Sequence, residues 1–206
     1  MKKVVTIFKT VSLFAITLAV LTTAGCKKDE DPPKEENEEE VITDLKLIFT
    51  NTSNSSDIVT ARAQDPDGTG VKELQILDTL NLDTSKTYAL TFEIMNNLET
   101  PGEDIGEEVK EEGDEHQIFF SFSNNAFANP MGNGNIDNAS DPVNYTDKDS
   151  KGNPIGLNST WETSKTQLSN GSFKVRLQHQ PDLKTSTSGA NDGDTDFELD
   201  FVLNIK

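Results

Sequence analysis

Two histidines are the residues of this chain whose type and placement could bind a metal ion. His116 opens the apolar run HQIFFSFS, and His179 lies near the end of the run SFKVRLQHQP. Both histidines fall on the apolar side of an alternating pattern, which predicts that both side chains point into the fold. If the two strands run antiparallel, the ends that carry the histidines lie at the same end of the structure. We therefore expect the two imidazoles to converge.

Acidic residues flank both histidines. Glu112 and Glu115 precede His116, and Asp182 follows His179. Two imidazoles with one or two carboxylates suit zinc or another divalent transition metal. The candidate metal ligands are therefore His116, His179, Glu115 and Glu112, and zinc or copper is expected ahead of iron. The alternative is that both histidines are structural and hydrogen-bond the backbone at strand ends, since neither has the tight spacing of an HExxH motif.

Three Asp-rich segments make calcium a further but weaker alternative. The segment DKDSKG begins like an EF-hand loop, yet Lys151 and Asn158 stand at two of its ligand positions. The segment NDGDTD offers Asp192, Asp194 and Asp196, and DPDGTG offers two more aspartates. Turns and solvated strand edges explain these acids equally well. Calcium is therefore expected less than zinc or copper.

Motifs of catalysis are missing from the sequence. It contains no serine elbow, no cysteine nucleophile and no glycine-rich phosphate loop. Trp161 and Tyr145 could form a platform for a sugar, but Trp161 aligns with Leu157 on its strand, which favours a place in the core. We expect a binding protein rather than an enzyme.

The elements that must position these residues are mostly strands. Apolar residues alternate through five segments near residues 41–49, 88–94, 116–122, 173–179 and 197–205. This pattern predicts an all-β domain over residues 41–206, an antiparallel β-sandwich of the Ig-like or jelly-roll-like kind. One short acidic helix is expected in TPGEDIGEEVKEEG, with Thr100 and Glu103 as a capping box and Pro101 at its first position. Residues 124–142 are expected to form a long polar loop.

The N-terminal residues have the order of a secretory signal peptide. A lysine-containing start and a short apolar stretch precede the small residues TTAG and Cys26, the only cysteine. The segment TAGC resembles the lipobox of bacterial lipoproteins, which implies cleavage after residue 25 and lipid attachment at Cys26. Residues 1–25 are therefore predicted to be a lipoprotein signal peptide. With Cys26 so used, no disulfide can form within the chain.

A charged segment follows Cys26. KKDEDPPKEENEEE contains two prolines and no apolar residue, so residues 26–40 are predicted to be the lipidated cysteine and a disordered acidic tether. A lysine followed by acids behind the lipid cysteine resembles the surface-export signal of lipoproteins in one large phylum of Gram-negative bacteria. We expect an outer-membrane, lipid-anchored protein exposed at the cell surface. The formal net charge of -18 disfavours nucleic acid as a partner.

Three segments carry a resemblance to a known family: EEVKEEGDEHQIFF, DKDSKGNPIGL and VRLQHQPDLK. They resemble small bacterial surface lipoproteins labelled "type 1 periplasmic binding fold superfamily protein". The resemblance implies an accessory component of TonB-dependent outer-membrane receptors, which import scarce metals, metal chelates or sugars, and it would apply to His116 and His179. The family label implies two Rossmann-like lobes, whereas the alternation in this chain predicts strands with only one helix.

The sequence thus predicts a lipid-anchored, non-enzymatic binding protein that captures a divalent transition metal or small ligand for uptake. The alternative is a structural or adhesive β-sandwich lipoprotein that binds a protein or glycan partner through its loops, chiefly residues 124–142.

Overall fold

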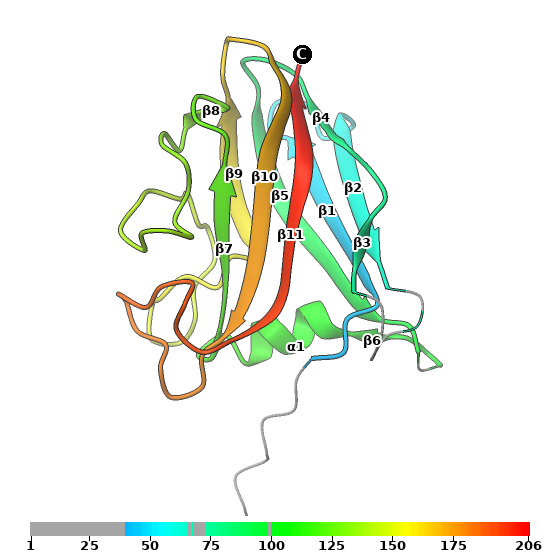
Figure 1. Ribbon diagram of the computed structural model, residues 1–206, viewed down its shortest axis with the longest axis vertical. Coiled ribbons are helices and arrows are strands. Elements are labelled where there is room, and N and C mark those ends of the chain that lie inside the picture. Colours follow the sequence, from blue (N-terminus) through cyan, green and yellow to red (C-terminus); the bar gives the residue numbers. More distant parts are fainter. Residues whose placement is uncertain (1–39, 66, 68–72, 99) are drawn as a thin grey trace, which may run out of the picture. The chain divides into compact units, whose positions relative to one another are not determined.

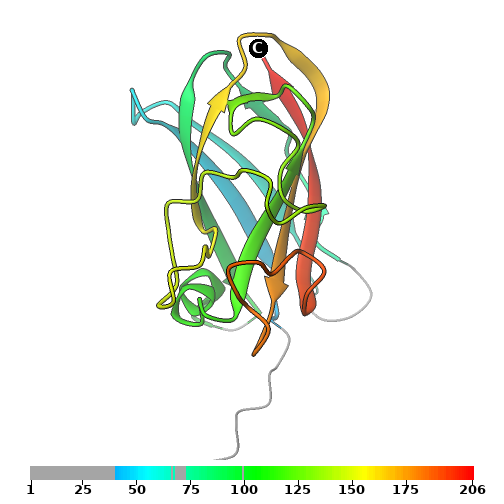
Figure 2. The ribbon, with the colours of Figure 1, turned by 90° about the vertical axis from the view of Figure 1, so that its left-hand side faces the viewer.

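A computed structural model describes residues 40–65, 67, 73–98 and 100–206. The predicted signal peptide, Cys26 and nearly all of the predicted tether lie outside these residues. The described residues form two β-sheets and one short helix, α1 (Ile105–Glu111), at one end of the strands (Figures 1 and 2). This arrangement confirms the predicted all-β, sandwich-like fold, and the described residues do not form two Rossmann-like lobes.

Strands from distant parts of the chain pair within each sheet. The larger sheet has the order β3-β2-β1-β5-β9-β8, and β6 pairs with β5; the smaller has the order β4-β11-β10-β7. The larger sheet comprises β1 (Asp44–Asn51), β2 (Ile58–Gln64), β3 (Gln75–Ile76), β5 (Thr87–Asn96), β6 (Glu103–Asp104), β8 (Phe127–Asn129) and β9 (Asn158–Thr163). The smaller sheet comprises β4 (Leu80–Leu82), β7 (His116–Phe122), β10 (Leu168–His179) and β11 (Asp194–Ile205). Neighbours run antiparallel, with the exception of β4 and β11, which run parallel.

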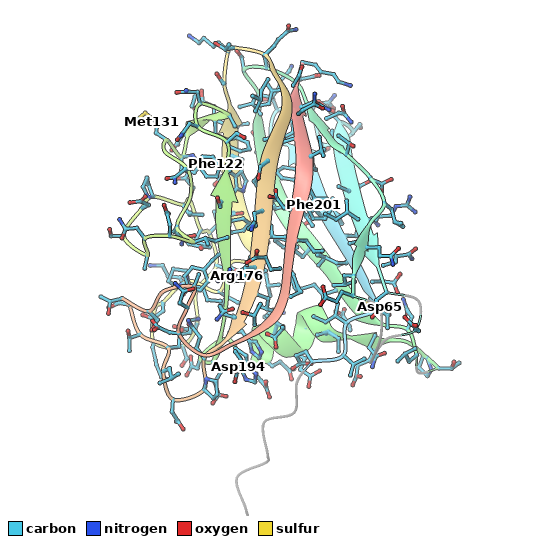
Figure 3. All side chains as sticks on the ribbon, in the orientation of Figure 1. Asp65, Phe122, Met131, Arg176, Asp194 and Phe201 are labelled. Carbon is cyan, nitrogen blue, oxygen red and sulfur yellow. The ribbon has the colours of Figure 1, made fainter. Side chains whose placement is uncertain are left out.

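The core lies between the inner faces of the two sheets. Side chains alternate between buried and less buried positions along β1 and β11, as the sequence pattern predicts for half-buried strands. Trp161 on β9 is fully buried and packs edge-on against Phe173 of β10 with ring centroids 5.1 Å apart. Figure 3 shows the side chains on both sheets, with Phe122 and Phe201 labelled. The core position of Trp161 excludes its use as a sugar-stacking platform.

The helix begins later than the sequence suggests. Its N-cap is Asp104, whose side chain accepts a hydrogen bond from the Glu107 backbone N–H at 3.2 Å. The expected capping box of Thr100 and Glu103 is therefore wrong. The reason is that Glu103 and Asp104 pair with β5 as the short strand β6, and helical dihedrals begin only after this pairing ends.

The long polar loop is shorter than expected. Phe127–Asn129 forms β8, which pairs with β9, and the side chain of Phe127 is buried against Trp161. Phe127 is the one large apolar residue between Asn124 and Pro130, and burying it draws this part of the chain onto the sheet edge.

Candidate metal site

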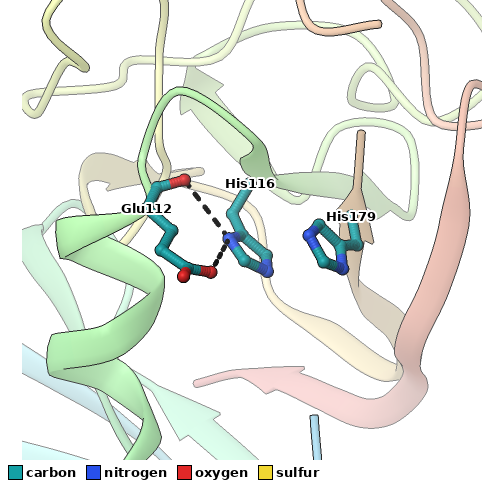
Figure 4. A group of neighbouring side chains, drawn as sticks. All are labelled: Glu112, His116 and His179. Carbon is teal, nitrogen blue, oxygen red and sulfur yellow. Dashed lines mark hydrogen bonds and ion pairs between the residues drawn. The ribbon is translucent and has the colours of Figure 1, made fainter. Parts of the chain in front are cut away.

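The two histidines lie directly opposite each other at one end of the smaller sheet. The antiparallel register of β7 and β10 pairs His116 with His179. Their imidazole rings stack, with centroids 4.2 Å apart and an angle of 14° between the ring planes (Figure 4). Both side chains are buried. The expected convergence of the two imidazoles is confirmed.

Helix α1 holds His116 from one side. Glu112, the C-cap residue of α1, offers its backbone carbonyl to two donors of His116: the backbone N–H at 3.2 Å and the ring Nδ1 at 3.3 Å. Because a carbonyl oxygen only accepts, Nδ1 must carry the proton of the neutral ring. The lone pair of His116 is therefore on Nε2. This nitrogen is buried and has no hydrogen-bond partner among the described residues.

A buried ion pair fixes the backbone between α1 and β7. The Lys184 ammonium donates to the carbonyl oxygens of Gly113 and His116 at 2.5 and 2.7 Å. It also pairs with the Asp149 carboxylate at 3.1 Å, and both side chains are fully buried. Burial lowers the pKa of Lys184, while Asp149 opposes that change. The main chain that carries His116 is thus tied to two separate loops.

Three carboxylates lie around the stacked rings. Glu112 Oε2 is 4.0 Å from His116 Nδ1, and Asp196 Oδ2 is 4.0 Å from His116 Nε2. Glu115 Oε2 is 3.8 Å from His179 Nε2. One ligand atom from each of Glu112, His116 and His179 lies within 4.8 Å of the others, so this group could hold a metal ion. All four residues predicted from the sequence therefore lie at one place, although Glu115 is not in that group of three.

Asp196 is the member of this site that the sequence offered only as a possible calcium ligand and did not group with the histidines. Alternation along β11 puts Asp196 on the solvent side, next to inward-facing Phe197. In the structure Leu177 pairs with Phe197 and Gln178 with Thr195, so the register skips Asp196 at a bulge. The side chain of Asp196 is only 2 % exposed as a result. A β-bulge changes which face a residue occupies, which a strict period of two cannot predict.

A glycine beside the bulge gives the one sequence signal for it. Gly193 has φ +82°, and a Cβ added there would lie 2.0 Å from the carbonyl oxygen of His179. Only glycine fits this close approach of the turn to the end of β10. Glycine at the start of a strand is typical of such irregularities, but it does not identify which acid turns inward.

The electrostatics of the site keep His116 neutral. Burial lowers the pKa of His116 to about 4, helped by the neighbouring His179 and Lys184 and opposed by the hydrogen bond to Glu112. Neutral imidazole is the form that binds metals. Nearby, burial and the carboxylates of Glu108, Glu112 and Glu103 raise the pKa of Glu40 to about 7. Burial is the largest cause, and the carboxylates add a negative potential at the helix end of the sandwich, which attracts cations.

The acids of the Asp-rich segment DKDSKG hold their own loop together. Asp147 accepts hydrogen bonds from the backbone N–H groups of Gly156 and Asn158. Asp149 accepts from the Asn153 backbone at 2.7 Å and pairs with Lys184. A protein ammonium and amide donors thus use the carboxylates that a calcium ion would need, and the structure gives the EF-hand-like reading of this loop no support.

In the part of the chain that the structure describes, no helix has the length and apolarity needed to cross a membrane. No protein-family model, curated protein or solved structure matches the chain. Its function must therefore be inferred from the residues of the site itself.

Proposed function

We propose that this protein is a lipid-anchored, non-enzymatic binding protein of the outer membrane that captures a divalent transition metal, zinc or copper, for uptake. The single observation that carries the proposal is the meeting of two buried imidazoles, His116 and His179, with ring centroids 4.2 Å apart and carboxylates around them. Lipid attachment at Cys26 and delivery to a TonB-dependent receptor complete the proposal and come from the sequence alone.

The composition of the cluster supports zinc or Cu²⁺ as the ion. Two imidazoles and surrounding carboxylates are nitrogen and oxygen donors of the kind that these ions accept. The group of three contains no thiolate, and soft sulfur ligands are what selects Cu⁺. The acidic surroundings at Glu40 and Glu112 would raise the local concentration of any cation.

Binding one ion requires a small movement of the rings. A metal lies in the plane of an imidazole, about 2.0–2.1 Å from the ligating nitrogen, and two such nitrogens on one tetrahedral ion are about 3.3 Å apart. Nearly parallel rings at 4.2 Å cannot both point at one ion. We therefore expect the rings to turn out of the stack when the metal binds, while the paired strands stay in register.

The test is a competition titration of the domain, residues 40–206, with zinc and a chromophoric chelator. The wild-type domain should take up about one zinc ion per chain, and the His116→Ala, His179→Ala double variant should lose this site. A matched control is Glu162→Gln, which removes a solvent-exposed charge far along β9 from the histidine end. Equal uptake by wild type and double variant would exclude the proposal and favour the structural or adhesive alternative.

A further inference from the structure

The carboxylate that lies nearest the free lone pair of the site belongs to Asp196 rather than Glu112. Glu112 approaches Nδ1 of His116, but that nitrogen carries a proton and donates it to the Glu112 carbonyl. A protonated ring nitrogen has no lone pair to share with a metal. Glu112 could act beside His116 as a ligand only if the hydrogen bond that orients the ring were broken.

The arrangement at the other nitrogen is the one found in metal-binding histidines. Such a histidine almost always donates its second ring N–H to a carbonyl or carboxylate, which fixes the tautomer and the ring orientation. His116 does this through Nδ1 to Glu112, and its Nε2 is fully buried and without a hydrogen-bond partner in the described part of the chain. Asp196 Oδ2 faces this nitrogen at 4.0 Å.

The distance between these atoms suits an ion better than a direct contact. At 4.0 Å, Nε2 and Oδ2 are too far apart for a hydrogen bond. On a tetrahedral ion with bonds of about 2.0–2.2 Å the two ligand atoms are about 3.3–3.5 Å apart, so Nε2 and Oδ2 need to approach each other by only about half an ångström to bind one ion. Glu115 stands in a similar relation to His179, with 3.8 Å between Oε2 and Nε2.

We propose that Asp196 is a ligand of the captured ion, bound together with Nε2 of His116, and that Glu112 orients His116 without touching the metal. This inference rests on the proposed function and assigns the coordinating atoms. It also gives the bulge in β11 a purpose, because the bulge points the Asp196 carboxylate toward the histidines at this end of the sandwich.

The test compares zinc affinity in three charge-neutralising variants. Asp196→Asn should weaken zinc binding by at least about 10- to 100-fold, since the loss of a group that only supports a metal ligand already costs this much. Glu112→Gln keeps the backbone carbonyl and should change affinity by less than about threefold. Asp200→Asn, an exposed acid farther along the same strand, controls for the general loss of charge and should also change it little.

A second measurement needs no variant and so does not depend on how the variants fold. Histidine ring nitrogens labelled with ¹⁵N report which nitrogen binds the metal in the wild-type domain loaded with zinc or cadmium. The proposal expects His116 to be metal-bound at Nε2 and protonated at Nδ1.

The possible outcomes distinguish a failure of the role of Asp196 from a failure of the proposed metal capture. Metal bound at Nδ1 of His116, or a loss of affinity in Glu112→Gln but none in Asp196→Asn, would overturn the role of Asp196 and leave metal capture standing. A wild-type domain that takes up no zinc would overturn both.

Discussion

His116 and His179 face each other across neighbouring antiparallel strands, with their rings stacked 4.2 Å apart. Side chains directly opposite each other on paired strands are the closest neighbours that a sheet offers. The register of β7 and β10 therefore decides that the two imidazoles meet. Because the pair lies where β7 begins and β10 ends, the end of helix α1 and the bulge in β11 can add carboxylates around it.

The buried, neutral state of His116 predicts that the metal-free domain loses stability in mild acid. The folded-state pKa of about 4 lies below the ordinary value of 6.5, so the unfolded chain binds the proton first as the pH falls. The stabilising contribution is complete above pH 6.5, is lost on the way to pH 4, and amounts to about 3 kcal/mol. Urea unfolding, followed by the single, buried Trp161, measures the free energy of unfolding at each pH.

The comparison variant is His116→Phe, which keeps an aromatic ring but does not titrate. Its free energy of unfolding should fall less than that of the wild type between pH 6.5 and 4. If the free energy of unfolding fell equally with pH in the two proteins, the pKa of His116 would not be lowered.

The raised pKa of Glu40 predicts a contribution to stability that changes with pH in the opposite direction to that of His116. Its pKa is raised to about 7, so its stabilising contribution is present at low pH and is lost as the pH rises through 7. Glu40→Gln should therefore stabilise the domain by about 1 kcal/mol at pH 8, allowing for partial exposure, and have little effect at pH 4. Thermal unfolding at both pH values, with the exposed Glu162→Gln as control, checks this. A gain that is the same at both pH values would contradict it.

The turn before β11 predicts that alanine substitutions at two glycines differ in the stability they cost. Gly193→Ala places a Cβ 2.0 Å from the His179 carbonyl, whereas Gly152 has a similar positive φ but no heavy atom within 4 Å of an added Cβ. Gly152→Ala should cost about 1–2 kcal/mol from backbone strain alone. Gly193→Ala should cost distinctly more and should also weaken zinc binding, since it disturbs the bulge that carries Asp196. Equal costs in urea unfolding would show that the turn moves freely.

The buried ion pair predicts a large loss of stability on substitution. Lys184→Met leaves the carboxylate of Asp149 and two carbonyl groups without their donor. Removing one partner of a buried pair typically costs about 3–5 kcal/mol. Lys151→Met removes an exposed pair with Asp114 at 3.5 Å and should cost less than about 1 kcal/mol. Similar unfolding free energies for these two variants would contradict the structural role of Lys184.

Much of the fold could be predicted because burial follows a simple period in this chain. The alternating apolar residues of β1, β5, β7, β10 and β11 all lie on inner faces, and this period also located the two inward histidines. Antiparallel pairing then predicted their meeting. The parallel partner of β11 could not be predicted, since β4 has only three residues and too little pattern to read.

The remaining errors come from local irregularities of the backbone. Asp196 was not grouped with the histidines because a bulge turns its side chain to the inner face, and the start of α1 was misplaced because Glu103 and Asp104 pair with β5 before the helix begins. Lys184 gave no signal at all, since an isolated lysine in a polar segment is almost always solvated. Only the three-dimensional structure reveals that its ammonium donates to the backbone carbonyl of His116.

Anomalous diffraction at the zinc edge, from crystals of the domain grown with zinc, tests the central claim most directly. We predict one strong zinc peak about 2.0–2.1 Å from a ring nitrogen of both His116 and His179, with the rings turned out of their stack. Zinc peaks on surface carboxylates alone, with the two rings still stacked, would contradict the account.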